Sequence, residues 1–366
     1  MKFFKRKLKN GTTVLMEKRY LPVISLSITN KFGAGNETSK IKGAAHFIEH
    51  LLFTGTKTRS HEDISREIEK KGGILNGFTA NEITSFWFKL PSKHIFAGLD
   101  ILTDLLNNPT FDELKFEKEK KVILEEIKMY HDSPEKYIYD KIEENLYKKP
   151  FGESITGSEK TISPMKRNFV ANLFKRSYNP RSYIVTLVGN ANFDKVCSYL
   201  EKNFKPRKDF IKPIFIKKKN SETSEKRAGI DQAHFIFAIH APLANDPNSD
   251  ALEVLDAYLA NGMSSRLFLK IREEKGLAYS IRSSITCEKS YSYYSIYIGT
   301  TAQALDEVKK IILDEFKNIA NMTKKDLEEA KERLIGLSKI SAEESSNVMN
   351  ELLFSEIAND ARDYYK

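Results

Sequence analysis

Apolar and polar residues alternate near the start of the chain and then adopt a helical spacing. The alternation runs through residues 2–8, 13–17 and 23–30. Asn10-Gly11 separates the first two of these segments, and this dipeptide is typical of a tight β-hairpin turn. Residues 38–54 then carry apolar side chains three and four positions apart. We therefore predict a hairpin, a third strand and a helix, in that order.

The succession of strands and helices occurs twice in the chain. In the first half, the pattern predicts strands at 83–90 and 182–188 and helices at 57–72, 94–106, 111–130 and 192–204. In the second half, it predicts strands at 232–240, 277–287 and 291–298 and helices at 250–260, 264–274, 302–320 and from 324 onward. We therefore predict an α+β protein built from two homologous units, each an antiparallel sheet with packed helices.

A basic segment with little predicted structure divides the two halves. It contains Pro206, Pro213 and the run Lys217–Lys219, which are features of a linker. We predict a first α+β domain at 1–206, a linker at 207–230 and a second domain at 231–366. The second domain ends on its last long helix, whereas the first continues past the corresponding helix. The second copy therefore looks shortened at its C-terminal end.

Composition excludes several classes of protein. The 366 residues carry 59 Lys and Arg against 50 Asp and Glu, and these charges are interleaved, so we expect no nucleic-acid partner. The only cysteines, Cys197 and Cys287, are too few for a disulfide scaffold or a cysteine-ligated metal site. No apolar run is long enough for a membrane span or a signal peptide. We expect a cytoplasmic protein without a membrane partner.

One short motif on the predicted helix at 38–54 has the spacing of a metal site. In His46-Phe-Ile-Glu49-His50, the two histidines lie four residues apart and therefore on one helix face. Glu49 is near enough to contact a water molecule at the metal without being forced to ligate the ion. H-x-x-E-H is the inverse of the zinc-protease motif H-E-x-x-H. The alternative is a helix with two unrelated histidines.

A catalytic zinc ion usually has three protein ligands, so one more is required. The candidates lie on the predicted helix at 111–130: Glu117, Glu119, Glu125 and Glu126. The apolar side chains of this helix define one face: Val122, Ile123, Ile127 and Tyr130. Glu119 and Glu126 fall within that face, where a carboxylate needs a cation or a hydrogen-bond partner. We predict Glu126 as the third ligand and Glu119 as the residue that orients a histidine; the alternative is that both pair with Lys or Arg.

These residues and several further segments resemble a known family, the inverted zinc metallopeptidases that include pitrilysin, insulysin and mitochondrial processing peptidase. The matching segments are His46–His50 with Glu119 and Glu126, 73–79 (GILNGFT), 124–127 with 132–134, 263–268 (MSSRLF) and 271–280 (IREEKGLAYS). The resemblance covers most of the chain and is closest to single-chain prokaryotic processing-peptidase-like members.

The resemblance implies a metallopeptidase clamshell half with one Zn²⁺ per chain. It implies that residues 73–79, with Asn76, Phe78 and Thr79, belong to an edge strand that binds extended substrate. It also implies that Arg272 and Tyr279 reach the substrate from the second domain. In the hydrolytic mechanism that the resemblance implies, zinc lowers the pKa of its bound water to about 7 and Glu49 acts as general base. Arg272 and Tyr279 would stabilise the oxyanion by roughly 2–4 kcal/mol each. Without the resemblance, these two would be read as a surface cation and a strand aromatic.

We therefore expect a zinc metalloendopeptidase that hydrolyses peptides or unfolded protein segments. By the resemblance, two such chains pair around a closed chamber, as a homodimer or a heterodimer. One alternative is a subunit of a hetero-oligomeric processing peptidase that cuts only with its partner. Another is a non-catalytic relative, like the core proteins of the respiratory cytochrome complex. We expect His234 and His240 to be structural; the alternative is a second metal site there.

Overall fold

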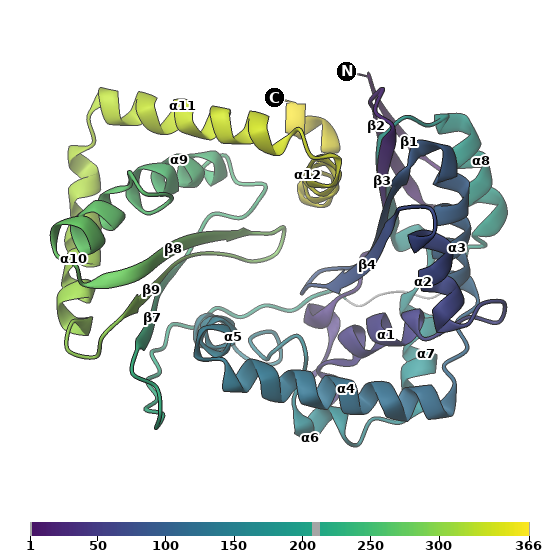
Figure 1. Cartoon of the computed structure of the whole chain (residues 1–366), viewed down its shortest axis with the longest axis horizontal. Coiled ribbons are helices and arrows are strands. Elements are labelled where there is room, and N and C mark those ends of the chain that lie inside the picture. The colour runs from purple at the N-terminus through teal and green to yellow at the C-terminus, as the bar shows by residue number, and fades with distance from the viewer. Residues whose placement is uncertain (1, 207–212, 366) are drawn as a thin grey trace. The chain divides into compact units, whose positions relative to one another are not determined.

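The computed structural model describes residues 2–206 and 213–365, which form two compact units (Figure 1). Unit 1 comprises Met1–Met129, Lys148–Lys217 and Glu344–Lys366, and unit 2 comprises Tyr130–Tyr147 and Lys218–Glu343. Each unit contains one sheet with packed helices, which confirms the predicted α+β class. None of the helices in the described residues is both long and apolar enough to cross a membrane.

Unit 1 contains a six-stranded sheet in the order β1-β2-β6-β3-β5-β4. Its strands are β1 (Lys2–Lys7), β2 (Thr13–Lys18), β3 (Val23–Asn30), β4 (Ile74–Thr79), β5 (Thr84–Pro91) and β6 (Tyr183–Gly189). β2 and β6 run parallel, and the other neighbours run antiparallel. The hairpin and the third strand that the alternation predicts are therefore present. β4 lies at an edge of the sheet and, within the part of the chain that the structure describes, pairs with β5 alone.

Apolar and small polar side chains alternate along the strands, so the two faces of this sheet differ and are covered by different helices. On β3, Leu26 and Ile28 point to the main core, whereas Ser25 and Ser27 point to the opposite face. The helices of unit 1 are α1 (Ala44–Phe53), α2 (His61–Glu69), α3 (Ile95–Asn107), α4 (Glu113–Asp132, to Met129), α6 (Glu159–Ile162), α7 (Arg167–Ser177), α8 (Phe193–Asn203) and α12 (Ser345–Ala358). α3 and α8 lie on one side of the sheet and α12 on the other (Figure 1).

Unit 2 contains a three-stranded antiparallel sheet in the order β7-β9-β8. Its strands are β7 (Ala233–His240), β8 (Ala278–Cys287) and β9 (Ser292–Thr300). Its helices are α5 (Pro134–Leu146), α9 (Ser249–Leu259), α10 (Leu305–Asn318) and α11 (Lys324–Ser341). The helix predicted at 264–274 is a π-helix over Phe268–Glu274. α9 and α10 build the core on one face of the sheet, and α5 contacts β7.

The two units are not continuous in sequence, and they differ from the division into residues 1–206 and 231–366. α5 belongs to unit 2, although it precedes the predicted linker. Residues 344–366 belong to unit 1, because α12 packs on β3 and β6 and Ser345 hydrogen-bonds Ser25 at 2.8 Å. Of the predicted linker, residues 207–212 lie outside the described residues, and Lys218 forms an isolated β-bridge with Tyr147.

Candidate metal centre

The His46–His50 segment lies on α1, which is held in the core by its apolar face. Phe47, Ile48 and Leu51 are buried, and the Phe47 ring stacks on the Phe116 ring of α4 with 4.7 Å between centroids. This packing fixes α1 against α4. His46 and His50 share the adjacent face, as their four-residue spacing predicts.

α4 brings two of its four candidate glutamates to α1. Glu119 and Glu126 are about four-fifths buried, with side-chain exposures of 21% and 22%. Glu117 and Glu125 are more than half exposed and pair with lysines of their own helix. The helical phase therefore separates the two pairs. It misplaces Val122, which is 43% exposed although the phase puts it on the apolar face.

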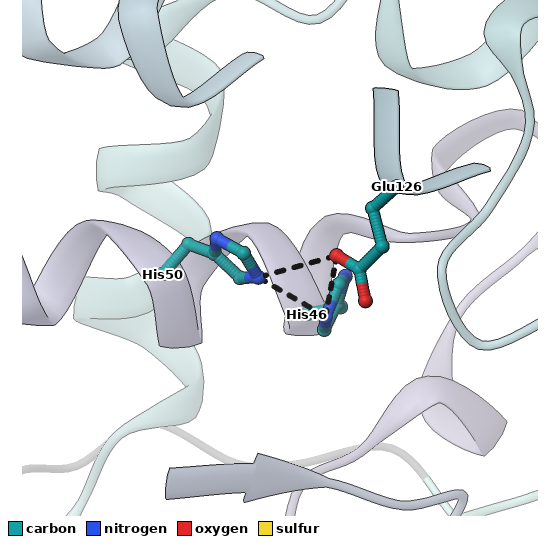
Figure 2. A group of neighbouring side chains, drawn as sticks. All are labelled: His46, His50 and Glu126. Carbon is teal, nitrogen blue, oxygen red and sulfur yellow. Dashed lines mark hydrogen bonds and ion pairs between the residues drawn. The ribbon is translucent and has the colours of Figure 1, made fainter. Parts of the chain in front are cut away.

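Three side-chain atoms from these helices converge, as Figure 2 shows. His46 Nε2 lies 3.2 Å from His50 Nε2. Glu126 Oε2 lies 3.7 Å from His46 Nε2 and 3.6 Å from His50 Nε2. On the other side of His50, its Nδ1 lies 3.4 Å from Glu119 Oε2. Among the described residues, this is the only group of three or more potential ligands this close together.

The three converging atoms fit a zinc ion. Zinc binds His nitrogen and carboxylate oxygen at about 2.0–2.2 Å in tetrahedral geometry, so neighbouring ligand atoms lie roughly 3.3–3.5 Å apart. The observed separations of 3.2, 3.6 and 3.7 Å lie close to that value. Glu119 occupies the position of the carboxylate that commonly orients a ligand histidine through its second nitrogen. The residues present therefore suit zinc.

The electrostatics of the two histidines agree with this reading. Burial, followed by the charge of His50, lowers the pKa of His46 to about 3, so its imidazole is neutral and has a lone pair to offer. Burial also lowers the pKa of His50, but the hydrogen bond with Glu119 and the charges of Glu49 and Glu126 outweigh it and raise the pKa overall. Carboxylates that favour an imidazolium at this position also favour a metal cation.

Glu49 lies one residue before His50 and does not join the three converging atoms. Its Oε2 accepts a hydrogen bond of 2.7 Å from the Thr79 hydroxyl at the end of β4. Burial raises the pKa of Glu49, and the bond from Thr79 and the charge of His50 oppose this shift. The carboxylate is thus beside the metal group without being part of it.

The expected substrate residues lie on β4. Asn76 pairs with Trp87 of β5 in the sheet register and is exposed, whereas Phe78 pairs with Ser85 and is half-buried. Thr79 contacts Glu49, a role that sequence reasoning did not assign to it. The edge of β4 away from β5 has no partner strand among the described residues.

Arg272 and Tyr279 lie in unit 2 and are close to each other. The Arg272 guanidinium carbon lies 5.2 Å from the centroid of the Tyr279 ring and 4.9 Å from that of Phe268. Tyr279 is 79% exposed. The π-helix ends just after Arg272, and β8 begins just before Tyr279.

The histidines of β7 have other partners. His234 Nδ1 lies 2.8 Å from the Tyr297 hydroxyl, and His240 Nε2 lies 3.0 Å from the Lys219 carbonyl oxygen. Both contacts lie within unit 2. Glu37 is not among the residues predicted from the sequence, yet its carboxylate accepts hydrogen bonds from the first turn of α1. No local spacing marks that residue.

A His-His-Glu group on two helices of an α+β unit, with a glutamate beside it, defines the class of zinc-peptidase-like proteins. Two family models match this chain: insulinase (peptidase family M16) over residues 13–159, and the peptidase M16 inactive domain over residues 164–334. The chain belongs to peptidase family M16, the pitrilysin-like family. His46, His50 and Glu126 all lie in the first of the two matched segments.

Curated relatives agree with the family assignment. A Bacillus subtilis protein named as the uncharacterized zinc protease YmxG is 30% identical over 356 residues, covering 94% of this chain and 87% of that protein. An uncharacterized zinc protease of Rickettsia felis is 32% identical, covering 88% of this chain and 79% of that protein. The crystal structure of a Helicobacter pylori protease shares the fold, with a TM-score of 0.91 and 23% identity, over 99% of this chain and 92% of that one.

Proposed function

We propose that this chain is a zinc-dependent endopeptidase that hydrolyses peptides or unfolded protein segments. The observation that carries the proposal is the pairing of two arrangements: the converging His46, His50 and Glu126 atoms, and the Glu49 carboxylate held beside them by Thr79. The first suits a metal ion, and the second is a proton acceptor that does not itself ligate.

His46, His50 and Glu126 hold the ion in this proposal, and Glu119 orients His50. A bound zinc ion lowers the pKa of water to about 7 and polarises a scissile carbonyl. Glu49 removes the proton of the attacking water as general base and delivers it to the leaving amine. Thr79 keeps the Glu49 carboxylate in the position from which both transfers are made.

The substrate binds to β4 as an added strand in this proposal. The unpaired edge of β4 offers backbone N–H and C=O groups to an extended peptide, with Asn76 and Phe78 on the strand. Such binding requires a segment free of other pairing, which favours peptides and unfolded chains. Arg272 and Tyr279 then donate hydrogen bonds to the oxyanion, each contributing roughly 2–4 kcal/mol.

We also propose a homodimer in the cytoplasm, with two copies enclosing a chamber. Cys197 and Cys287 are free thiols, which suits a reducing compartment. Light scattering of the purified chain tests the assembly: a mass of two chains is expected, and a monomer that cleaves peptide contradicts it.

Glu49→Gln tests the proposed activity. The variant keeps the shape of the side chain and removes the base, so it should retain about one zinc ion per chain and lose cleavage of an unstructured fluorogenic peptide by about 100-fold or more. Glu125→Gln is the matched control, because Glu125 is exposed on α4 and pairs only with Lys128 in the described contacts. It should cleave like the unaltered chain.

The remaining outcomes separate the alternatives. Cleavage by the unaltered chain should disappear with a chelator and return with zinc. A zinc-loaded chain that does not cleave alone supports a subunit of a hetero-oligomer and contradicts a self-sufficient enzyme. A chain that binds no zinc supports a non-catalytic relative. Equal cleavage by Glu49→Gln and the unaltered chain overturns the assigned base.

A further inference from the structure

The helix that carries both ligand histidines has no capping side chain of its own. The first N–H groups of a helix have no partner within the helix and are usually bound by a Ser, Thr, Asp or Asn at the N-cap. The N-cap of α1 is Gly43, with φ +93°. A Cβ added there would lie 2.6 Å from the Thr156 carbonyl oxygen. Gly43 therefore leaves no room for the residues that normally supply the cap.

Glu37 supplies the missing cap from outside the helix. Its Oε2 accepts a hydrogen bond of 2.9 Å from the Gly43 N–H, and its Oε1 accepts one of 2.5 Å from the Ala45 N–H. Glu37 is 2% exposed and follows directly after a 3-10 turn at Ala34–Asn36. Both carboxylate oxygens are thus used to bind the first turn of α1.

Lys42 balances the charge of this buried carboxylate. The residue is 1% exposed, and its Nζ donates a hydrogen bond of 2.9 Å to the Ala34 carbonyl oxygen. Burial raises the pKa of Glu37 to about 7, while the charge of Lys42 and the helix N–H groups oppose the shift. A buried carboxylate with a nearby cation and several N–H donors is held firmly, because each partner would otherwise be left without compensation.

The position of His46 depends on this turn more than that of His50 does. A ligand histidine usually donates its second ring N–H to a carboxylate or carbonyl, which fixes the ring. His50 has Glu119 at 3.4 Å from its Nδ1. The Nδ1 of His46 is buried and has no hydrogen-bond partner among the described residues. The ring of His46 is therefore oriented by packing and by its backbone, which follows directly after Ala45.

We propose that Glu37 is a positioning residue of the metal site, which binds the first turn of α1 and thereby places His46 opposite His50 and Glu126. The inference rests on the proposed zinc site. In other ligand histidines, a hydrogen bond to the second ring nitrogen fixes the orientation of the ring. We assign this function for His46 to Glu37, which acts through the backbone of α1. Loss of the carboxylate should therefore weaken zinc binding beyond any loss of stability.

The test compares Glu37→Gln with Glu17→Gln in the full chain. Glu17 is a fully buried glutamate of the same unit, on β2, and accepts hydrogen bonds of 2.5 Å each from Arg19 Nε and the Tyr365 hydroxyl. Zinc affinity is measured by competition with a chromophoric chelator, the ligand field by the visible spectrum of the Co²⁺ form, and stability by urea unfolding. Both variants should unfold at lower urea, but only Glu37→Gln should bind zinc about 10-fold or more weakly and shift the Co²⁺ bands.

Each outcome decides the proposal. Unchanged zinc affinity and Co²⁺ spectrum in Glu37→Gln overturn it, as does equal weakening in Glu17→Gln. If Glu37→Gln does not fold, Glu37→Asp replaces it, since it keeps a carboxylate with a shorter reach, and a threefold or greater weakening is expected. Failure of both to fold while Glu17→Gln folds assigns Glu37 to folding alone. If the unaltered chain does not bind zinc, the proposed function is refuted. If it binds zinc but does not cleave peptide, the zinc affinities of the variants still decide whether Glu37 positions His46.

Discussion

The Thr79 hydroxyl donates a hydrogen bond of 2.7 Å to Oε2 of Glu49 and so joins the end of β4 to the metal-site helix. Gly77, two residues earlier on β4, makes this approach possible, because a Cβ there would lie 3.0 Å from the Phe53 ring of α1. The edge strand and the proposed base are therefore one structural assembly within unit 1.

Thr79→Val should lower kcat about 10-fold and leave zinc content unchanged, because the carboxylate of Glu49 loses the hydrogen bond from the Thr79 hydroxyl while the proposed ligands stay in place. Thr79→Ser keeps the hydroxyl and should retain most of the activity. Steady-state kinetics with an unstructured peptide check both variants. A raised KM with unchanged kcat would assign Thr79 to substrate binding instead.

Glu119→Gln should weaken zinc binding by about 10- to 100-fold, because the carboxylate that we propose to orient His50 loses its charge. Glu117→Gln is the control, since Glu117 lies two residues away on α4 and pairs with Lys120 on the exposed side. Competition titration measures both affinities. Equal affinities would place Glu119 outside the metal site.

Tyr279→Phe should lower kcat/KM by about 30- to 100-fold, which corresponds to the lower part of the roughly 2–4 kcal/mol proposed for an oxyanion donor. The ring and its contact with Arg272 remain, so the change isolates the hydroxyl. Zinc affinity should not change, because the ligands lie in unit 1. Tyr20→Phe, at a tyrosine 86% exposed on unit 1, is the control. Full activity of Tyr279→Phe would remove the hydroxyl from the mechanism.

Lowering the pH should reduce the free energy of unfolding that the Glu344 carboxylate contributes. The hydrogen bond from Lys89, then that from Ser346, lowers the pKa of Glu344 to about 2. Because the pKa of Glu344 is lower in the folded chain than in the unfolded one, its carboxylate stabilises the fold at pH values above its ordinary pKa of 4.5. This contribution is lost as the pH falls toward 2. The pair is partly exposed, so we expect roughly 0.5 kcal/mol.

Urea unfolding of the unaltered chain and Glu344→Gln at pH 6 and pH 3 measures this contribution. The variant should be less stable at pH 6, and the difference should shrink at pH 3. A difference that is the same at both pH values would contradict the assigned role of the Glu344 carboxylate.

The sequence is informative about the proposed metal site because the side chains that form it lie on two helices, where the helical period predicts which residues share a face. Spacing alone places His46 and His50 on one face, and phase alone separates Glu119 and Glu126 from Glu117 and Glu125. Phase defines the centre of a face better than its margins, which is why Val122 is exposed. Contacts that join segments distant along the chain, such as Thr79 to Glu49, have no comparable periodic signal.

The same limit explains the difference in domain boundaries. α12 has a buried apolar face that includes Val348, Met349 and Leu352, and this pattern reveals a packed helix without naming the sheet that it covers. The observed partner is the face of β3 and β6 that carries Ser25, Ser27 and Thr186. Small polar residues on that face gave no sign that a distant helix would bury them.

The placement of α12 also bears on how the protein is made. A ribosome completes the last strand of the unit 1 sheet at Gly189, but the helix that covers one face of β3 and β6 does not begin until Ser345. During the intervening translation, that face of the nascent sheet has no cover from its own helix. Unit 1, which carries the proposed metal site, is therefore completed only after the segment from Ser345 has been synthesised, long after the last strand of its sheet.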